Sequence, residues 1–362
     1  MRVFITMTAV MLTIALGGTS WSAPPTSASA PGPIQAPPVS GDLAQDVAAP
    51  GQGCEGGQPC EGEGEPGVLG SVFGRFLCPG ECDPHWSFSG DAVALQRSSA
   101  RSQPLFSSGT TELVNSRHLE FPVALGFQLD AIRRGPCGWE WELGYFQIDN
   151  FDASSTVAGD SFMTTSSDGT GQFVSNAEAR YRSAIHLAEI NLRRQWCEGF
   201  TVLVGFRTGE LDEIYSAGGL GTRLQAPINL DIKTFNHLYG LQTGAIYEFY
   251  NIGGPLRVSA TCKAGMYGNS AIQSSHLAET GDSLLEAHRN QATFMGEAGA
   301  LANYDVTCHL SLRAFCQAMW IEGVALAPEQ IGANDFTTLA AGIDTHGGVF
   351  YYGGGLGAEL KF

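Results

Sequence analysis

The polar residues with the most regular spacing are charged side chains at every second position of otherwise apolar segments. Glu189, Asn191 and Arg193 follow this spacing in one segment, and Arg257 and Lys263 share a phase in another. Alternate residues of a β-strand face the same side of a sheet. Acids and bases gathered on one side of several strands would form ion pairs with one another. The same spacing could also line a narrow path for ions or small solutes.

We assign the polar side of each such segment to the interior of a barrel. The predicted interior structural polars are Glu140, Glu142, Glu189, Asn191, Arg193, Arg207, Gln242, Arg257, Lys263, Glu297, Arg313 and Glu359. With Asp130, Glu248 and Lys361 added, the set holds seven acids and six bases. This near balance favours structural packing over a charge-selective pore, because removing one partner would leave a buried charge unpaired.

Several short motifs resemble enzyme sites, but their context argues against catalysis. Gly281-Asp282-Ser283-Leu284 spells the nucleophile block of one esterase family, yet no buried strand precedes it. Asp344 and His346 have the wrong spacing for that family. Residues that could assemble a protease site at an outer rim, although no spacing requires it, are Asp152, Asp160, Asp168, Asp282, His288 and His346. We therefore predict no catalytic residues, no metal site and no cofactor.

The N-terminal 85 residues predict export followed by a linker. Arg2 precedes an apolar run at 3–16 and then small residues, which is the pattern of a secretory signal peptide. We place cleavage after Ser22, since the run is short for a retained membrane helix. Residues 23–85 are rich in Pro, Gly and Glu, and such a composition cannot bury enough apolar area to fold. They predict a disordered periplasmic linker.

From Trp86 onward, apolar and polar residues alternate with a period of two, as expected of strands with a lipid face and a lumen face. In 255–268, for example, Leu256 and Val258 alternate with Arg257 and Ser259. The candidate strands are 86–97, 119–132, 139–149, 181–195, 199–210, 237–249, 255–268, 291–304, 309–321 and 348–362.

The gaps between these ten segments alternate between long ones of 21 to 31 residues and short ones of 3 to 6. Short periplasmic turns, long external loops and an even strand number are typical of outer-membrane barrels. An open sheet edge is not tolerated in hydrocarbon. We therefore predict a closed antiparallel transmembrane β-barrel of about ten strands over 86–362. Twelve strands are the alternative if 150–180 or 322–347 contains a further hairpin.

Composition agrees with a barrel and limits its partners. Charged residues make up only 15% of the chain, Gly is abundant at 47 residues, and the mean hydropathy is near zero. The net charge of −17 argues against a nucleic-acid partner. The in-phase residues that resemble the C-terminal signal read by barrel-assembly machinery are Phe350, Tyr352, Leu360 and Phe362. We expect that machinery and outer-membrane lipid as partners, with small solutes or ions if the lumen is open.

Nine cysteines in an exported chain favour disulfides. The candidates are Cys54, Cys60, Cys78, Cys82, Cys137 and Cys197. The first four could close two small loops in the linker. A bond between Cys137 and Cys197, or from either to the linker cysteines, would brace the periplasmic rim. Cys262 and Cys316 share the lipid-facing phase and should behave as small apolar residues.

Four segments occur in an order that resembles a known family. They are Ser183–Arg193, Val204–Arg207, Leu238–Gly244 and Gly323–Gln330. Over about 86–362 the chain resembles the planctomycete outer-membrane barrel family, related by name to the Legionella major outer-membrane protein. The resemblance implies a barrel without an established biochemical activity, so no catalytic residues carry over. The residues that match motif positions, and that the resemblance and phase together place in the lumen, are Glu189, Asn191, Arg207 and Gln242.

Together these patterns predict a non-enzymatic outer-membrane barrel that serves as envelope structure or as a narrow pore. The alternative is a surface-binding or adhesion barrel that acts through its five long external loops. A barrel-embedded hydrolase is the third and least favoured hypothesis. The sequence does not set an oligomeric state.

Overall fold

The computed structural model describes residues 85–362, apart from 136–137, 224, 252 and 280–281. The expected signal peptide and nearly all of the linker lie outside the described residues. The strands are β1 (Trp86–Arg97), β2 (Pro104–Ser108), β3 (Thr111–Asn115), β4 (Ala124–Arg134), β5 (Trp139–Thr164), β6 (Gly171–Cys197), β7 (Phe200–Gly221), β8 (Pro227–Asn251), β9 (Leu256–Ala278), β10 (Asp282–Asp305), β11 (Leu310–Val324) and β12 (Gly347–Lys361). Two short 3-10 helices accompany them, η2 (Ser116–His118) and η4 (Ala327–Ala333).

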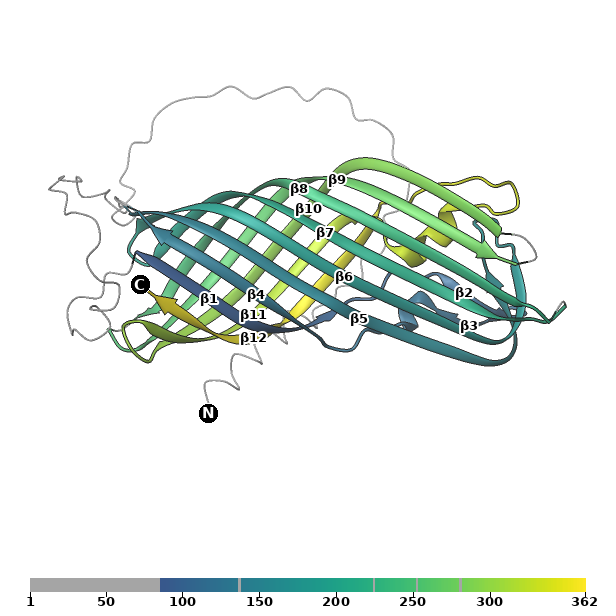
Figure 1. The fold of residues 1–362 in the computed structure, drawn as a ribbon, viewed down its shortest axis with the longest axis horizontal. Helices are drawn as coiled ribbons and strands as arrows, with labels where there is room; N and C mark the ends of the chain where they lie inside the picture. The colour runs from purple at the N-terminus through teal and green to yellow at the C-terminus, as the bar shows by residue number, and fades with distance from the viewer. Residues whose placement is uncertain (1–84, 136–137, 224, 252, 280–281) are drawn as a thin grey trace, which may run out of the picture. The chain divides into compact units, whose positions relative to one another are not determined.

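Ten of these twelve strands close into one antiparallel ring (Figure 1). The ring runs β1-β12-β11-β10-β9-β8-β7-β6-β5-β4 and returns to β1. At the seam, the Trp86 and Phe362 backbones exchange two hydrogen bonds of 3.0 and 2.8 Å. The prediction of a closed antiparallel barrel of about ten strands is confirmed.

The two remaining strands form a hairpin outside the ring. β2 pairs with β3, and through Phe106 and Ser107 it also pairs with the far part of β5. The sheet has twelve strands in all, as the alternative allowed, but the extra hairpin is β2–β3 and does not lie in 150–180 or 322–347. The segment 150–180 belongs mostly to β5 and β6, while 322–347 contains η4.

β5 to β10 are much longer than a membrane crossing requires. β5 has 26 residues and β6 has 27, whereas β11 and β12 have 15 each. At about 3.3 Å per residue and a tilt of about 40°, 26 residues rise about 65 Å, against an apolar band of about 25 Å. The expected long loops at 150–180, 211–236 and 269–290 are therefore largely strand.

A cross-strand row divides the barrel into two parts. It runs Gln147, His186, Glu210, His237, Ser270, Asn290. We call the part between this row and the two chain ends of the ring, Trp86 and Phe362, the belt half. The part beyond the row is the distal half.

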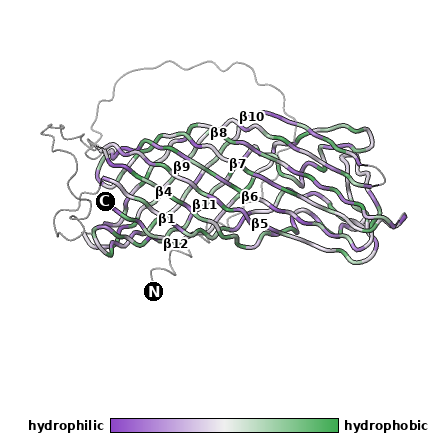
Figure 2. Tube along the Cα trace, viewed as in Figure 1, coloured by the Kyte–Doolittle hydropathy of each residue, from purple (hydrophilic) through white to green (hydrophobic). Residues whose placement is uncertain are grey.

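The belt half has an apolar outer surface and a polar interior. Figure 2 shows the alternation of apolar and polar residues along the strands. Large apolar side chains exposed on its outside include Leu125, Leu143, Ile190, Phe206, Leu241 and Leu356. Aromatic residues stand at its borders, with Trp139 and Trp141 near the short turns and Tyr239 next to the dividing row. This is the outer surface of a transmembrane barrel.

The distal half has the opposite arrangement. Its buried interior includes Tyr181, Ile185, Leu211, Tyr215, Leu230 and Ile232. Arg180, Arg182 and Lys233 are exposed on its outer face. Such a barrel is packed like a water-soluble one. No helix among the described residues is long and apolar enough to cross a membrane.

Candidate functional site

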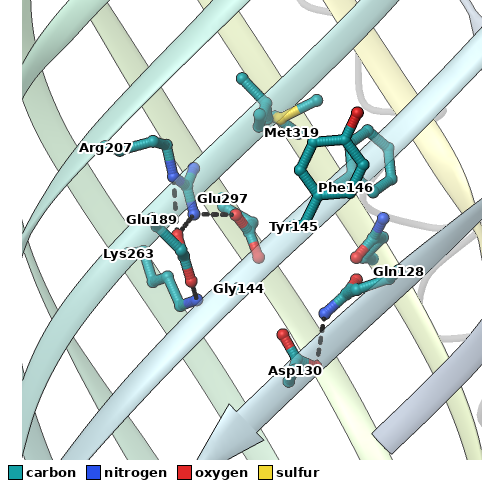
Figure 3. Close-up of a pocket in the computed structure, with 12 residues that line it drawn as sticks. Gln128, Asp130, Gly144, Tyr145, Phe146, Glu189, Arg207, Lys263, Glu297 and Met319 are labelled. Atoms are coloured by element: carbon teal, nitrogen blue, oxygen red, sulfur yellow. Dashed lines mark hydrogen bonds and ion pairs between the residues drawn. The ribbon is translucent and has the colours of Figure 1, made fainter.

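Glu189 is the centre of a polar network inside the belt half (Figure 3). Its Oε1 accepts a hydrogen bond from Lys263 Nζ at 2.6 Å. Its Oε2 accepts from Arg207 Nε at 2.8 Å and from Gln242 Nε2 at 2.9 Å. The four side chains come from the neighbouring strands β6, β7, β8 and β9. They meet because each faces the lumen at nearly the same height.

The network continues in both directions around the wall. Arg207 Nη2 lies 2.9 Å from Glu297 Oε2. Glu142 accepts from Asn191 at 2.8 Å and from Arg193 at 2.7 Å. Arg193 also lies 3.5 Å from a Glu140 oxygen. Nine of the predicted interior polars are thus joined, namely Glu140, Glu142, Glu189, Asn191, Arg193, Arg207, Gln242, Lys263 and Glu297.

The other three predicted polars face the lumen outside this network. Arg313 lies 3.4 Å from Asp91 and 3.7 Å from Asp130. Arg257 pairs with Asp305 at 3.2 Å. Glu359 forms no ion pair with a described residue, although it borders the same cavity.

Sequence reasoning missed two of the carboxylates in these pairs. Asp91 lies in the first expected strand and shares the inward phase of Ser87 and Ser89. That phase was the available signal, but this strand alternates least clearly. Asp305 lies one residue beyond the expected segment 291–304, although β10 includes it.

The lumen is wide next to the chain ends and closes at Glu189. A cavity of about 410 Å³ lies below the network, lined by residues that include Arg134, Glu140, Arg257 and Glu359. Beside Glu189 lies a small cavity of about 30 Å³, which has room for one or two waters. Immediately beyond, four inward-facing apolar residues are buried, namely Phe146, Leu187, Met295 and Met319.

We call the segment 325–346 the plug loop; η4 lies within it (Figure 1, yellow), and its first part, 325–331, is buried in the distal interior, whereas 337–341 is exposed. Asn236 binds the Ala325 backbone twice, donating to its carbonyl at 2.9 Å and accepting from its N–H at 2.8 Å. Farther along, Asn334 bonds to Gln273 and Ser275, each at 2.9 Å. The expected external loop at 322–347 therefore folds inward.

A second buried ion pair supports the start of the plug loop. Glu213 pairs with Arg97 and accepts hydrogen bonds from Tyr181 Oη at 2.6 Å and from the Ala327 N–H at 2.8 Å. The Arg97 guanidinium also lies over the Phe121 ring, 4.8 Å from its centroid, as in a cation–π contact. The contacts of Glu213 join the barrel wall to the plug loop.

Glu329 is a buried carboxyl within the plug loop. Its Oε1 accepts a hydrogen bond from the Arg101 N–H at 3.0 Å, and its Oε2 has no partner in the described part of the chain. Burial raises the pKa of Glu329, and the hydrogen bond from Arg101 only partly opposes that shift.

Two of the candidate protease residues pair with side chains outside the candidate set. Asp152 pairs with Arg180, whose hydrogen bond lowers the pKa of that carboxyl. His346 pairs with Asp344 at 2.8 Å in an exposed position. No hydrogen bond or ion pair joins any two of Asp152, Asp160, Asp168, Asp282, His288 and His346 within the described ranges. Nor do these ranges contain three or more His, Cys, Asp or Glu residues grouped to hold a metal ion.

The cysteines and the C-terminal signal are placed only in part. Cys197 is in a disulfide, and the other five candidate cysteines, Cys54, Cys60, Cys78, Cys82 and Cys137, lie outside the described residues. Cys262 and Cys316 are free and face outward in the belt half. The four residues of the expected assembly signal are all exposed on the outside, namely Phe350, Tyr352, Leu360 and Phe362.

Fold and interior together define the class. The chain is a ten-stranded closed transmembrane β-barrel whose lumen is blocked within its described residues, first by an ionic network and then by a packed core and an inward-folded loop.

Comparisons with known proteins add structural likeness at low identity. No family model matches the chain, and no curated protein matches it. The solved structure of the outer membrane protease OmpT from Escherichia coli aligns over 78% of this chain and 97% of its own, with a TM-score of 0.48 and 9% identity. The Pseudomonas putida toluene transporter TodX aligns over 77% and 90%, with a TM-score of 0.34 and 10% identity. A Pseudomonas aeruginosa FadL homologue aligns over 77% of this chain and 91% of its own, with a TM-score of 0.31 and 7% identity. Values this low say nothing about the activity of this chain.

Proposed function

We propose that this chain is an outer-membrane barrel with a closed lumen and a structural role in the cell envelope. One observation carries the proposal: the lumen is blocked twice in succession, by the Glu189 network and by the plug loop. A narrow pore would require solutes to pass between the ion-paired side chains of the Glu189 network and then through the buried residues beyond it. The buried ion pairs at that level are costly to separate.

The outer-membrane location is supported by the belt half. Ten strand residues between Trp196 and His186 rise about 25 Å at a tilt of about 40°, which matches the apolar band of outer-membrane barrels. The short turns then lie on the periplasmic side and the distal half outside the cell. The expected signal peptide and assembly signal agree with this orientation.

We also propose that the chain belongs to the planctomycete outer-membrane barrel family. Its support is that motif residues from three separate segments meet in one network, namely Glu189, Asn191, Arg207 and Gln242. The fourth motif, 323–330, covers the end of β11 and the start of the plug loop.

Planar-bilayer recording of purified protein, combined with density-gradient fractionation of cells, tests the proposal. We expect to find the protein in the outer-membrane fraction. We also expect that the folded barrel, once inserted in the bilayer, gives no conductance steps. Insertion is checked by the shift in SDS-gel mobility between unheated and boiled samples. Resolved single-channel steps from the unaltered protein would overturn the closed lumen.

A surface-binding role is the second candidate, and the distal half favours it. β5 to β10 present a broad sheet beyond the membrane, in place of three of the five loops expected from sequence. Comparing the surface attachment of cells with and without the protein tests this role. A hydrolase finds no support in the positions of its six candidate residues.

A further inference from the structure

A trough runs along β7 on the outer face of the distal half. Cross-strand register places Ser216 between Arg180 on β6 and Asp231 on β8, and Gly218 between Glu178 and Asn229. The central strand thus presents small residues between two rows of larger polar ones. The resulting hollow has a volume of about 570 Å³.

Backbone geometry contributes to the hollow. The pairing of β6 with β7 shifts register between Ser175 and Glu178, and Asn176 has a positive φ of 52°. Such a bulge increases the local twist of a sheet and turns its side chains. Leu220 and Pro227 border the outer end of the trough. From Ser216 to Leu220 the floor spans about 13 Å, and the walls are two strand spacings, about 10 Å, apart.

The walls offer hydrogen-bonding groups that the protein itself does not use. The side chains of Glu178, Arg182 and Asn229, all exposed, form no hydrogen bond or ion pair with another described residue. Arg180 pairs with Asp152, and Asp231 accepts from Ser216 at 2.6 Å. Two arginines and two carboxylates line the trough, so its formal charge is zero. Carboxylate, guanidinium and amide groups can each form two hydrogen bonds in a plane.

We propose that this trough binds the saccharide chain of neighbouring lipopolysaccharide in the outer leaflet. The neighbouring hydroxyl groups of a sugar ring can each bond to one of the two hydrogen-bonding atoms of such a planar group. Because the formal charge of the trough is zero, the trough does not favour a polyanion. An added peptide strand finds no edge, because β7 is hydrogen-bonded on both sides. The trough opens sideways and lies ten residues beyond Tyr239, about 25 Å above the apolar band. Sugar beyond lipid A occupies that level. The inference rests on the proposed outer-membrane location.

Isothermal titration calorimetry on purified full-length protein tests the trough directly. The probes are the deacylated saccharide of lipopolysaccharide from the bacterium that produces the protein, the intact lipopolysaccharide, and dextran as an unrelated neutral polymer. We expect saturable heat with the deacylated saccharide. The double variant Glu178→Ala, Arg182→Ala should raise its Kd at least tenfold, and Ser216→Trp, which fills the floor, should abolish binding.

The matched control is Glu286→Ala, Arg289→Ala, which removes the same charges from exposed β10 and should leave Kd unchanged. No heat from the deacylated saccharide, equal binding of dextran, or an unchanged Kd in the trough variants would each overturn the inference. Binding of intact lipopolysaccharide alone would place recognition at the lipid, which also overturns it. Because the titration uses purified protein, failure of the outer-membrane proposal appears separately, in cell fractionation.

Discussion

The belt half and the distal half are built from the same strands with opposite polarity. On β8, Leu241 faces outward and is 69% exposed, whereas on the distal part Ile232 faces inward and is fully buried. The polar residues reverse as well, since Gln242 faces inward and Lys233 outward. Each half buries its polar or apolar side according to the solvent that surrounds it.

The polarity of the two halves is reversed by the choice of side chains, while the backbone pairing continues unchanged. β7 pairs with β8 from Phe200–Tyr247 to Leu220–Pro227 without a register shift. A strand keeps its alternation across the boundary, so only the choice of residue changes. A membrane barrel can thus extend into water by exchanging the phase of its apolar residues.

The largest expected effect comes from unpairing the belt interior. Glu189→Ala would leave Arg207 and Lys263 without their shared carboxylate, so we expect a loss of about 3–5 kcal/mol in the free energy of unfolding. The measurement is urea unfolding in lipid vesicles. The control is Asp152→Ala, which breaks an exposed pair on the distal face and should cost less than about 1 kcal/mol. Similar losses in both variants would contradict the contrast between interior and surface.

Truncating a leucine should distinguish the two apolar surfaces. Leu211 is fully buried in the distal core, and Leu211→Ala should cost about 2–5 kcal/mol because a cavity remains. Leu241→Ala on the belt should cost about 1–2 kcal/mol, since lipid fills the vacated space. The same unfolding assay measures both. A larger cost at Leu241 would mean that its surface is not lipid-facing.

Introducing a charge on the outside sharpens the position of the boundary. Leu241→Arg places a cation in the apolar band and should cost about 2–4 kcal/mol. Ile272→Arg makes a comparable change on the outer face of the distal half, where we expect a difference within about 0.5 kcal/mol. Equal costs would show that the dividing row does not mark the edge of the membrane.

Sequence alone predicted the belt half because lipid outside and polar groups inside impose one phase. Leu241 and Gln242 each face the side that this phase requires. The distal half was missed because the search kept that phase. On β6 the apolar residues change from even positions such as Ile190 to odd positions such as Ile185. Searching for this exchange of phase would have found the extensions.

The plug loop and the β2–β3 hairpin could not be predicted from alternation. The segment 325–346 folds inward through side-chain bonds to distant strands, such as those from Asn236. β2 and β3 have five residues each, too few for a clear period. The pairing of Asp91 with Arg313 depends on which strands lie close together. That arrangement is set only when the ring closes.

The smallest expected effect concerns pH and the plug loop. The raised pKa of Glu329 means that the folded state holds its proton more tightly than the unfolded chain does. The stability that this carboxyl contributes is complete below pH 4.5, the ordinary pKa of a glutamic acid, and falls as pH rises through its pKa in the folded state. Glu329→Gln keeps the shape of the side chain without its charge. The variant should melt at the same temperature as the wild type at low pH and at an increasingly higher temperature as pH rises toward neutrality. Asp335→Asn, an exposed change in the same loop whose carboxyl has a lowered pKa, should show the opposite trend. A difference between wild type and Glu329→Gln that is constant across pH would mean that Glu329 stays charged inside the fold.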